Sequence, residues 1–450
     1  EQHDAEEMDW GALSSAVVGA QDGAQDGANV FYEPISDTKL QALLVEWKRS
    51  EAERTAVLEA VEKLIAACAA MPDVNRESDP RLRDMRNIRS ALLAFKTRHQ
   101  IIAELDATLP PAAGGETVRW NRVEYETKPA DSGVGRMYPK VKGWWEDDKY
   151  RCAALSGMPG DLRPALTGEF LIDIDGVKSD LFIYLLLMRD TDFPEDEKAR
   201  RTKEILTYIN DPDAWHREVA RWYLAQMNEP GGEEGSAVPE DVLSKVKRFP
   251  NILANGGVHD TLMLKSMPEW PKSLLPHPLV NAMEKELRVL RIDLLHKNKD
   301  FAAAQTERLK RERPDKSPEE IKRTVFSRLV HTRESAILLI SVDTVRRLVA
   351  QEPGGGDLSH KEKRAGALVF DGCMPMVPES MRTEEGAGRM IKEIEAELAR
   401  KGHGGYRLAV KPNFGLQDQP VASAVRAMQA LEQAKRDYPE ADMASIMALG

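Results

Sequence analysis

The strand-like segments of this chain are short, and long stretches of helical periodicity separate them. Apolar runs of β-strand length occur at 170–175, 366–370 and 406–410, whereas the sequence between the first two is largely helical in pattern. Strands from such distant parts of a chain can share a sheet only if the helices between them form insertions. We therefore predict a helix-rich α+β fold with a small antiparallel sheet.

Two helices are expected ahead of these strands. Apolar stripes at helical spacing run over 38–70, and a second helical pattern covers about 82–105, so residues 38–108 are predicted to form an antiparallel helical pair. The Pro- and Gly-rich stretch 109–116 ends this unit. Alternating apolar residues at 118–127 then predict a strand or hairpin.

Two later helices have recognisable positions. Ser317 and Glu320 form a capping box with Pro318 at the first helical turn, which predicts a helix that reaches about residue 351. A last helix is expected over about 421–436, packed on the body of the protein.

Composition indicates a globular protein without a membrane partner. Of the 450 residues 42% are apolar, enough for a sizeable core, and the length suits about two to four structural units. The longest apolar stretches, 64–71 and 181–188, are eight residues each, far short of the ~20 that span a bilayer. Three scattered cysteines offer neither a disulfide framework nor a zinc site, so we expect an intracellular protein.

Negative charge is concentrated at the N-terminus. Residues 1–38 contain nine acids and no Lys or Arg, and they account for nine of the eleven net negative charges, so the remaining 412 residues carry a net charge of −2. Their polar, Gly-rich composition predicts that residues 1–37 are a disordered acidic tail, which could bind a protein partner. The near-neutral remainder is compatible with a basic channel for nucleic acid.

Two acidic strand ends are candidates for a metal site. Asp173 and Asp175 alternate along a predicted strand, which puts both carboxylates on one face. Asp371 follows the apolar run 366–370 and precedes Gly372. If the two strands are neighbours, Asp175 and Asp371 converge, and such carboxylates suit Mg²⁺ together with substrate phosphates. Taken singly, each Asp fits a turn or helix-cap residue equally well.

A basic segment that ends in glycines is a candidate phosphate site. Lys245, Lys247 and Arg248 precede Gly256 and Gly257. A helix with this sequence would present cations to a triphosphate, while the glycines permit the close approach of another group. The same pattern also fits an ordinary solvated basic helix with a glycine stop.

The order of these three segments resembles motifs A, B and C of family A DNA polymerases and single-subunit phage-type RNA polymerases. The flanking sequence extends the resemblance over about 135–415, most closely to the divergent branch encoded by transposons and viruses. Gly135-Arg136 looks like the element upstream of motif A, and 155–166 is similar to the stretch that precedes that motif. Arg333-Glu334 opens a helix like the one before motif C, and 391–415 is similar to the helix and closing strand after it.

The resemblance implies a right-hand polymerase architecture with a small antiparallel palm sheet, a helical thumb and helical fingers. It assigns 38–108 to the thumb-like region, 117–190 and 360–450 to the palm, and 191–358 to the fingers. It also implies a template-directed nucleotidyltransferase that acts on a primer–template and nucleoside triphosphates. DNA is favoured over RNA as the product because Asp180 stands where DNA-making members carry an acid that crowds a 2′-hydroxyl.

The resemblance further implies a role for each candidate residue. Asp175 and Asp371, with Asp173 beside them, would hold two Mg²⁺ ions, which lower the pKa of the primer 3′-hydroxyl and stabilise the leaving pyrophosphate. Lys247 would neutralise the triphosphate and could protonate the leaving group. The expected nucleotide-binding residues are Lys247, Arg248, Gly256, Gly257 and Asp180, and the expected contacts to nucleic-acid phosphates are Arg136 and Arg163.

Departures from the family pattern leave other functions open. Phe370 stands where motif C usually has a His, and Gly372 stands where DNA polymerases often carry a second acid. Asn255 replaces an expected aromatic residue, and Leu243 replaces the first Arg of the motif B helix. These departures favour one alternative, a catalytically inactive polymerase-like protein that binds nucleic acid or a replication partner. A helical scaffold is a third possibility, and it predicts that the two strand-end acids lie far apart.

Overall fold

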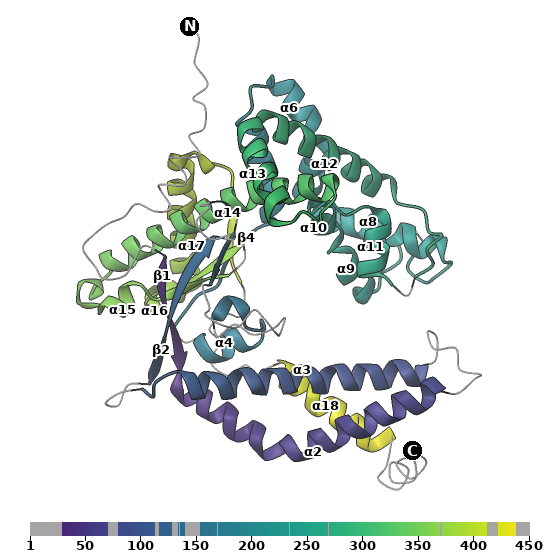
Figure 1. Cartoon of the computed structure of the whole chain (residues 1–450), viewed down its shortest axis with the longest axis vertical. Helices are drawn as coiled ribbons and strands as arrows, with labels where there is room; N and C mark the ends of the chain where they lie inside the picture. The colour runs from purple at the N-terminus through teal and green to yellow at the C-terminus, as the bar shows by residue number, and fades with distance from the viewer. Residues whose placement is uncertain are drawn as a thin grey trace.

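A computed structural model describes residues 29–70, 80–112, 117–127, 134, 136–139, 154–168, 170–233, 235–268, 270–369, 371–411 and 422–437. Two small sheets lie between a layer of long helices and a group of shorter helices (Figure 1). The predicted helix-rich α+β fold with small antiparallel sheets is confirmed. None of the helices in the described ranges combines the length and apolar character needed to cross a bilayer.

The central sheet has the strand order β5-β6-β4-β7, with every neighbouring pair antiparallel. Its strands are β4 (Ile174–Gly176), β5 (Gly366–Val369), β6 (Gly372–Pro375) and β7 (Leu408–Val410). The strands predicted at 170–175, 366–370 and 406–410 are therefore confirmed. Each is shorter than predicted, and β4 extends one residue beyond the predicted end. Since β5 and β6 are buried along their whole length, this sheet forms part of the core rather than a solvent-exposed face.

A second antiparallel sheet corrects the prediction for the N-terminal tail. It consists of β1 (Val30–Ser36), β2 (Val118–Thr127) and β3 (Met137–Pro139), in that order. The prediction of a disordered tail over 1–37 is wrong for β1, because Phe31 and Ile35 are fully buried and the strand pairs with β2 along its length. The part of the tail before residue 29, including its proposed role in binding a partner, lies outside the described residues.

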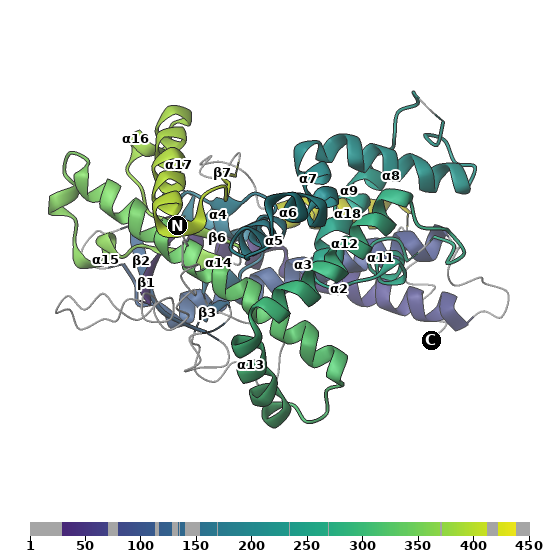
Figure 2. The same ribbon diagram turned by 90° about the horizontal axis from the view of Figure 1, so that it is seen from above.

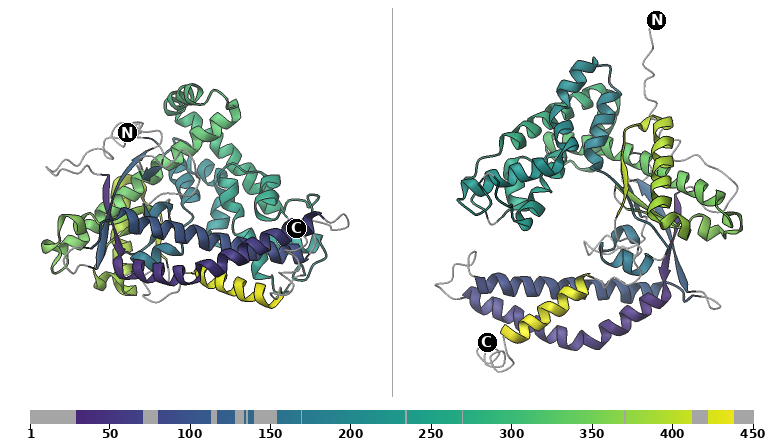
Figure 3. Two further views of the ribbon diagram at one scale, coloured as in Figure 1. Left: turned by 60° about the horizontal axis from the view of Figure 1, so that its bottom comes forward. Right: turned by 180° about the vertical axis from the view of Figure 1, so that it is seen from behind.

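Long helices form a layer on one side of the sheets (Figures 1 and 3). α2 (Asp37–Ala70) and α3 (Pro80–Thr108) form the predicted helical pair, in which the rings of Trp47 and Phe95 pack with centroids 4.9 Å apart. α18 (Ala422–Asp437) packs on this pair, where Ala430 is buried. The assignment of 360–450 to a single palm unit is therefore wrong for α18, which belongs to the helical layer.

The segment between β4 and β5 supplies the group of shorter helices and one long helix. α14 (Pro318–Gln351) begins at the predicted capping box, in which Ser317 and Glu320 each accept a hydrogen bond from the other's backbone N–H. α14 runs from the helix group to the central sheet, where it contacts β6 (Figure 2). The division into a fingers unit over 191–358 stays a prediction. The others are α5 (Ser179–Arg189), α6 (Glu195–Arg201), α7 (Lys203–Asn210), α8 (Pro212–Gln226), α9 (Glu240–Val246), α10 (Phe249–Ala254), α11 (His259–Ser266), α12 (Pro278–Lys297) and α13 (Lys299–Glu312).

Short helices surround the central sheet and close its edges. The largest, α17 (Glu384–Leu398), packs against α14 and β7. The others are η1 (Leu155–Gly157), α4 (Leu162–Thr167), η2 (Gly355–Asp357), α15 (His360–Lys363), α16 (Glu379–Arg382) and the π-helical turn η3 (Ala399–His403).

Candidate functional site

The β5–β6 hairpin brings the two strand-end acids together. Asp371 lies in the turn of this hairpin, and the next residue, Gly372, pairs with Asp175 of β4. The backbone N–H of Gly176 donates to the carbonyl oxygen of Asp371 at 3.1 Å and holds the turn against β4. The predicted convergence of Asp175 and Asp371 is confirmed, and the alternative that places them far apart is contradicted.

Gly372 leaves no room for a side chain at the centre of this pair. A Cβ atom at this position would lie 2.5 Å from the carbonyl oxygen of Ile174 and closer still to the carboxylate of Asp175. A second acid after Asp371 would therefore push β4 and β6 apart. Close strand pairing is the packing reason for this departure from the family pattern.

Burial and mutual repulsion destabilise negative charge on these acids unless a cation compensates for it. Burial, reinforced by the neighbouring carboxylate of Asp175, raises the pKa of both Asp371 and Asp173 above the ordinary carboxyl value. Asp173 is 3% exposed, and its Oδ1 atom has no hydrogen-bond partner among the described residues. A nearby cation would stabilise the charged form of all three acids, and carboxylate oxygens suit a hard divalent ion.

The acids do not form a complete metal cage. Within the described ranges, no group of three or more His, Cys, Asp or Glu side chains could hold a metal ion. Asp175 and Asp371 would therefore supply only part of the coordination shell of a divalent ion. Mg²⁺ commonly binds in this way, through one or two carboxylates with water and substrate phosphates as the remaining ligands.

Lys411 is the cation that the chain itself places at these acids. Its Nζ atom lies 2.5 Å from Oδ2 of Asp175 and 3.1 Å from Oδ2 of Asp173, which confirms that both carboxylates share one face. The Lys411 backbone N–H donates to the carbonyl oxygen of Asp173 at 2.9 Å. Our sequence analysis gave this residue no role, although its position directly after the predicted strand 406–410 was a usable signal.

Arg163 also acts on this acid cluster. It lies in α4, and its positive charge favours the ionised form of Asp173. Two of its guanidinium nitrogens, Nε and Nη1, are buried and make no hydrogen bond within the described part of the chain. Because these two nitrogens are shielded from solvent, contact between Arg163 and a phosphate stays a prediction.

A buried ion pair borders the acids on the other side. The guanidinium of Arg136 donates to Glu334 of α14 through Nε at 2.7 Å and Nη2 at 2.9 Å. Burial raises the pKa of Glu334 to about 7, and the negative charges of Asp180 and Asp371 contribute to this shift. The predicted phosphate-binding residue Arg136 thus makes a bidentate pair with a carboxylate in this structure. Sequence analysis gave Glu334 no role of its own, since nothing local marks the partner of a buried acid.

The motif B-like segment joins this cluster through Asn255. The Nδ2 atom of Asn255 donates to Oδ2 of Asp180 at 3.0 Å, so the segment reaches α5 directly behind β4. Gly256 adopts a positive φ of 84°, and a Cβ there would lie 2.5 Å from Nη1 of Arg291. A Cβ at Gly257 would meet Ile252 at the same distance, so both glycines are required for close packing.

We predicted that Lys247 and Arg248 lie on one continuous helix, and this prediction is wrong. They form the break between α9 and α10, because Pro250 lacks the backbone N–H that a continuing helix needs. Lys247 is half exposed and pairs with Glu240 at 3.3 Å. No described contact joins Lys247 to Asp175 or Asp371, so the predicted triad of two acids and this ammonium is only partly assembled.

The arrangement as a whole is an acid cluster with cations on both sides, next to a segment that packs through glycines. Such a cluster can hold a divalent ion and position phosphate groups beside it. Neither a family model nor a curated protein sequence matches the chain. The geometry of the described residues therefore carries the functional argument.

Proposed function

We propose that the protein is a template-directed nucleotidyltransferase, a DNA polymerase of the family A type, in which Asp175 and Asp371 hold two Mg²⁺ ions. The observation that carries this proposal is the meeting of the two acids at the central sheet, with Asp175 on β4 and Asp371 in the turn of the hairpin whose strand β6 pairs with β4. The acids come from distant parts of the sequence and each is half-buried. Carboxylates that repel one another are retained in such a place when a cation between them is required for function.

The bound metal would lower the pKa of a primer 3′-hydroxyl and stabilise the pyrophosphate that leaves. The residues of the chain then have separate tasks. Asp175 and Asp371 would hold and orient the ions, while the buried Asp173 would add negative charge beside them. Arg163 contributes positive charge at the same place.

The surrounding elements fit this reaction. The layer of α2, α3 and α18 stands across from the helix group α6–α13, with the sheets between them (Figure 3). We propose that the layer acts as the thumb, the helix group as the fingers, and the central sheet as the palm. Asp180, held by Asn255 beside the acids, would contact the sugar of the incoming nucleotide.

The main alternative is a polymerase-like protein that binds nucleic acid without catalysis. Specific observations favour it. Lys411 already neutralises Asp173 and Asp175, Gly372 excludes a second acid, and Lys247 pairs with Glu240 of the preceding helix. This alternative predicts that Mg²⁺ or Mn²⁺ leaves the melting temperature unchanged and that no primer is extended.

Primer extension tests the proposal directly. The full chain, a labelled primer–template, deoxynucleotides and Mg²⁺ should give extension that Asp371→Asn abolishes while the fold stays intact. Asp260→Asn is the matched control, because Asp260 is 92% exposed on α11, away from the acid cluster. Full activity of Asp371→Asn would remove the assignment.

A further inference from the structure

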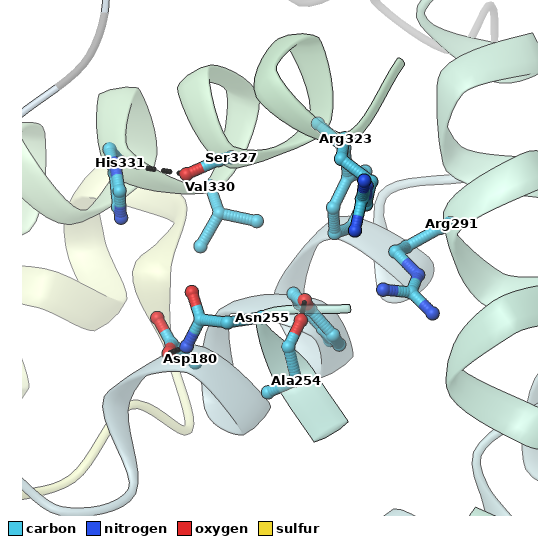
Figure 4. A pocket seen from close by; sticks show the side chains of 10 residues that line it. Asp180, Ala254, Asn255, Arg291, Arg323, Ser327, Val330 and His331 are labelled. Carbon is cyan, nitrogen blue, oxygen red and sulfur yellow. Dashed lines mark hydrogen bonds between the residues drawn. The ribbon is translucent and has the colours of Figure 1, made fainter. Parts of the chain in front are cut away.

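A small hollow lies behind the acid cluster, between α5, α10, α12 and α14 (Figure 4). Its volume is about 60 Å³, which is room for a group the size of a phosphate rather than for a whole nucleotide, and one side opens to solvent. Two arginines from different helices, Arg291 of α12 and Arg323 of α14, extend into one end of it. Asp180 and Asn255 lie across from them.

The two guanidinium groups are unpaired among the described residues. Neither Arg291 nor Arg323 makes a hydrogen bond or ion pair with any residue in the described ranges, and the positive charge of each acts on the other. The nearest acids are engaged elsewhere, since Glu284 accepts from the backbone of His259 and Glu320 accepts from Ser317. Like charges that converge without a counter-ion favour an anion between them.

The backbone of the motif B-like segment supports this arrangement. Gly256 lies against Arg291. A methyl group at this position would come within 2.5 Å of Nη1 of Arg291 and within 3.3 Å of Cδ of Arg323. Burial lowers the pKa of Arg291, and the neighbouring positive charge of Arg323 contributes to this shift. The glycine therefore permits a partly desolvated guanidinium that water neutralises less well than an exposed one.

The other wall of the hollow combines neutral polar groups with a packed aromatic pair. Ser327 and His331 share a contact at 3.4 Å, while the rings of Phe326 and Tyr184 are buried against each other. Burial lowers the pKa of His331 to about 4, so its ring is neutral at pH 7. This wall therefore adds no charge that would offset the two arginines.

We propose that this hollow binds the phosphate of a nucleotide between Arg291 and Arg323, with the rest of the nucleotide outside it. Arginine pairs are suited to phosphate because each guanidinium can donate two parallel hydrogen bonds. The phosphate belongs either to a single-stranded nucleic acid or to a free nucleoside triphosphate. The choice of a nucleotide rests on the proposed function, since Asp180 connects the hollow with the acid cluster.

Binding without divalent ions tests the site separately from catalysis. The probes are a fluorescein-labelled single-stranded oligothymidylate, followed by anisotropy, and dTTP, followed by calorimetry. Arg291→Ala/Arg323→Ala should weaken binding of at least one probe by about tenfold or more, the size expected for lost charged hydrogen bonds. Arg217→Ala/Lys272→Ala removes the same charge from exposed positions outside the hollow and is the matched control.

The pattern of loss identifies the source of the phosphate. A loss confined to the oligothymidylate assigns the site to a strand, a loss confined to dTTP assigns it to the nucleotide, and a loss of both assigns it to both. Gly256→Ala, which keeps both arginines but displaces Arg291, should give a smaller loss and serves if the double variant does not fold.

Binding equal to that of the control for both probes, or no binding by the unaltered chain, would overturn the proposal. Because the assays contain no metal or primer, a chain that binds through these arginines but never extends a primer would keep the site and lose the proposed function.

Discussion

Replacing Lys411 by Met should strengthen divalent-ion binding at the acid cluster. The ammonium of Lys411 lies 2.5 Å from Asp175 and 3.1 Å from Asp173, so an ion that reaches these oxygens must displace it. Met keeps the length and apolar stem of the side chain but removes the charge. The variant therefore leaves the carboxylates unpaired and available.

The size of the effect follows from the exposure of the pairs. The Lys411 side chain is 42% exposed and that of Asp175 is 26% exposed, so solvent screens their attraction. The Asp173 side chain is only 4% exposed, but solvent screens its partner Lys411, so each of the two pairs is taken as worth about 1 kcal/mol. Removing both should tighten ion binding by about 2 kcal/mol, which is about 30-fold in the dissociation constant.

The assay is calorimetric titration of the full chain with Mn²⁺ in the absence of nucleotide. Lys401→Met is the control, because Lys401 is exposed in η3 and pairs with no acid in the described part of the chain. Mn²⁺ binding by Lys411→Met that is equal to or weaker than that of the unaltered chain would refute the reasoning. Lys411 would then support the site rather than compete with the ion.

Three further changes test the packing and charge of the structure. Gly372→Ala should lower the free energy of unfolding in urea by about 1–3 kcal/mol, because the new methyl group overpacks β4. Gly388→Ala, whose methyl group would face open space, should leave it unchanged. Equal stability of the two variants would contradict the close pairing of β4 and β6. Burial raises the pKa of Glu334 from 4.5 to about 7, so the folded protein holds this proton more tightly than the unfolded chain does. This proton stabilises the fold by at most about 3 kcal/mol. The stabilisation is complete below pH 4.5, the pKa of Glu334 in the unfolded chain, and is lost as the pH rises through 7. Glu334→Gln should therefore flatten the pH dependence of the free energy of unfolding between these two values. Trp47→Ala should cost about 3–5 kcal/mol because its side chain is fully buried between α2 and α3, whereas Val45→Ala, at a site 68% exposed, should change stability little.

Signals within short stretches of sequence predicted the elements whose structure depends on residues close together in the chain. The capping box at Ser317 and Glu320 marked the start of α14, because both hydrogen bonds lie within one helical turn. The apolar runs before Asp371 and around Asp175 marked the strands of the hairpin and of β4. The convergence of these two acids also followed from the pattern, since two short buried strands have few ways to share a sheet.

The missed features depend on contacts between distant segments. β1 was hidden because Glu33 and Pro34 interrupt its apolar pattern. Glu33 is buried nonetheless, since it accepts hydrogen bonds from Tyr125 at 2.9 Å, from Asn121 at 3.0 Å and from the backbone of Leu155 at 2.9 Å. No local pattern indicates three donors from two other parts of the chain.

The candidate site shows the same limit. The break at Lys247 could have been predicted from Pro250, which is a local signal. The pairing of Arg136 with Glu334 depends on how α14 packs against the central sheet, and the approach of Arg291 to Gly256 depends on how α12 packs against α10. Side chains that come from separate helices acquire their partners only through that packing.

The most direct test of the account is the position of a bound metal ion. A crystal of the full chain with Mn²⁺, a primer–template and a non-hydrolysable deoxynucleotide would show the ion by its anomalous scattering. The account predicts an ion bound by carboxylate oxygens of both Asp175 and Asp371, with Lys411 displaced from them. Anomalous density elsewhere, with Lys411 still paired to both Asp173 and Asp175, would contradict it.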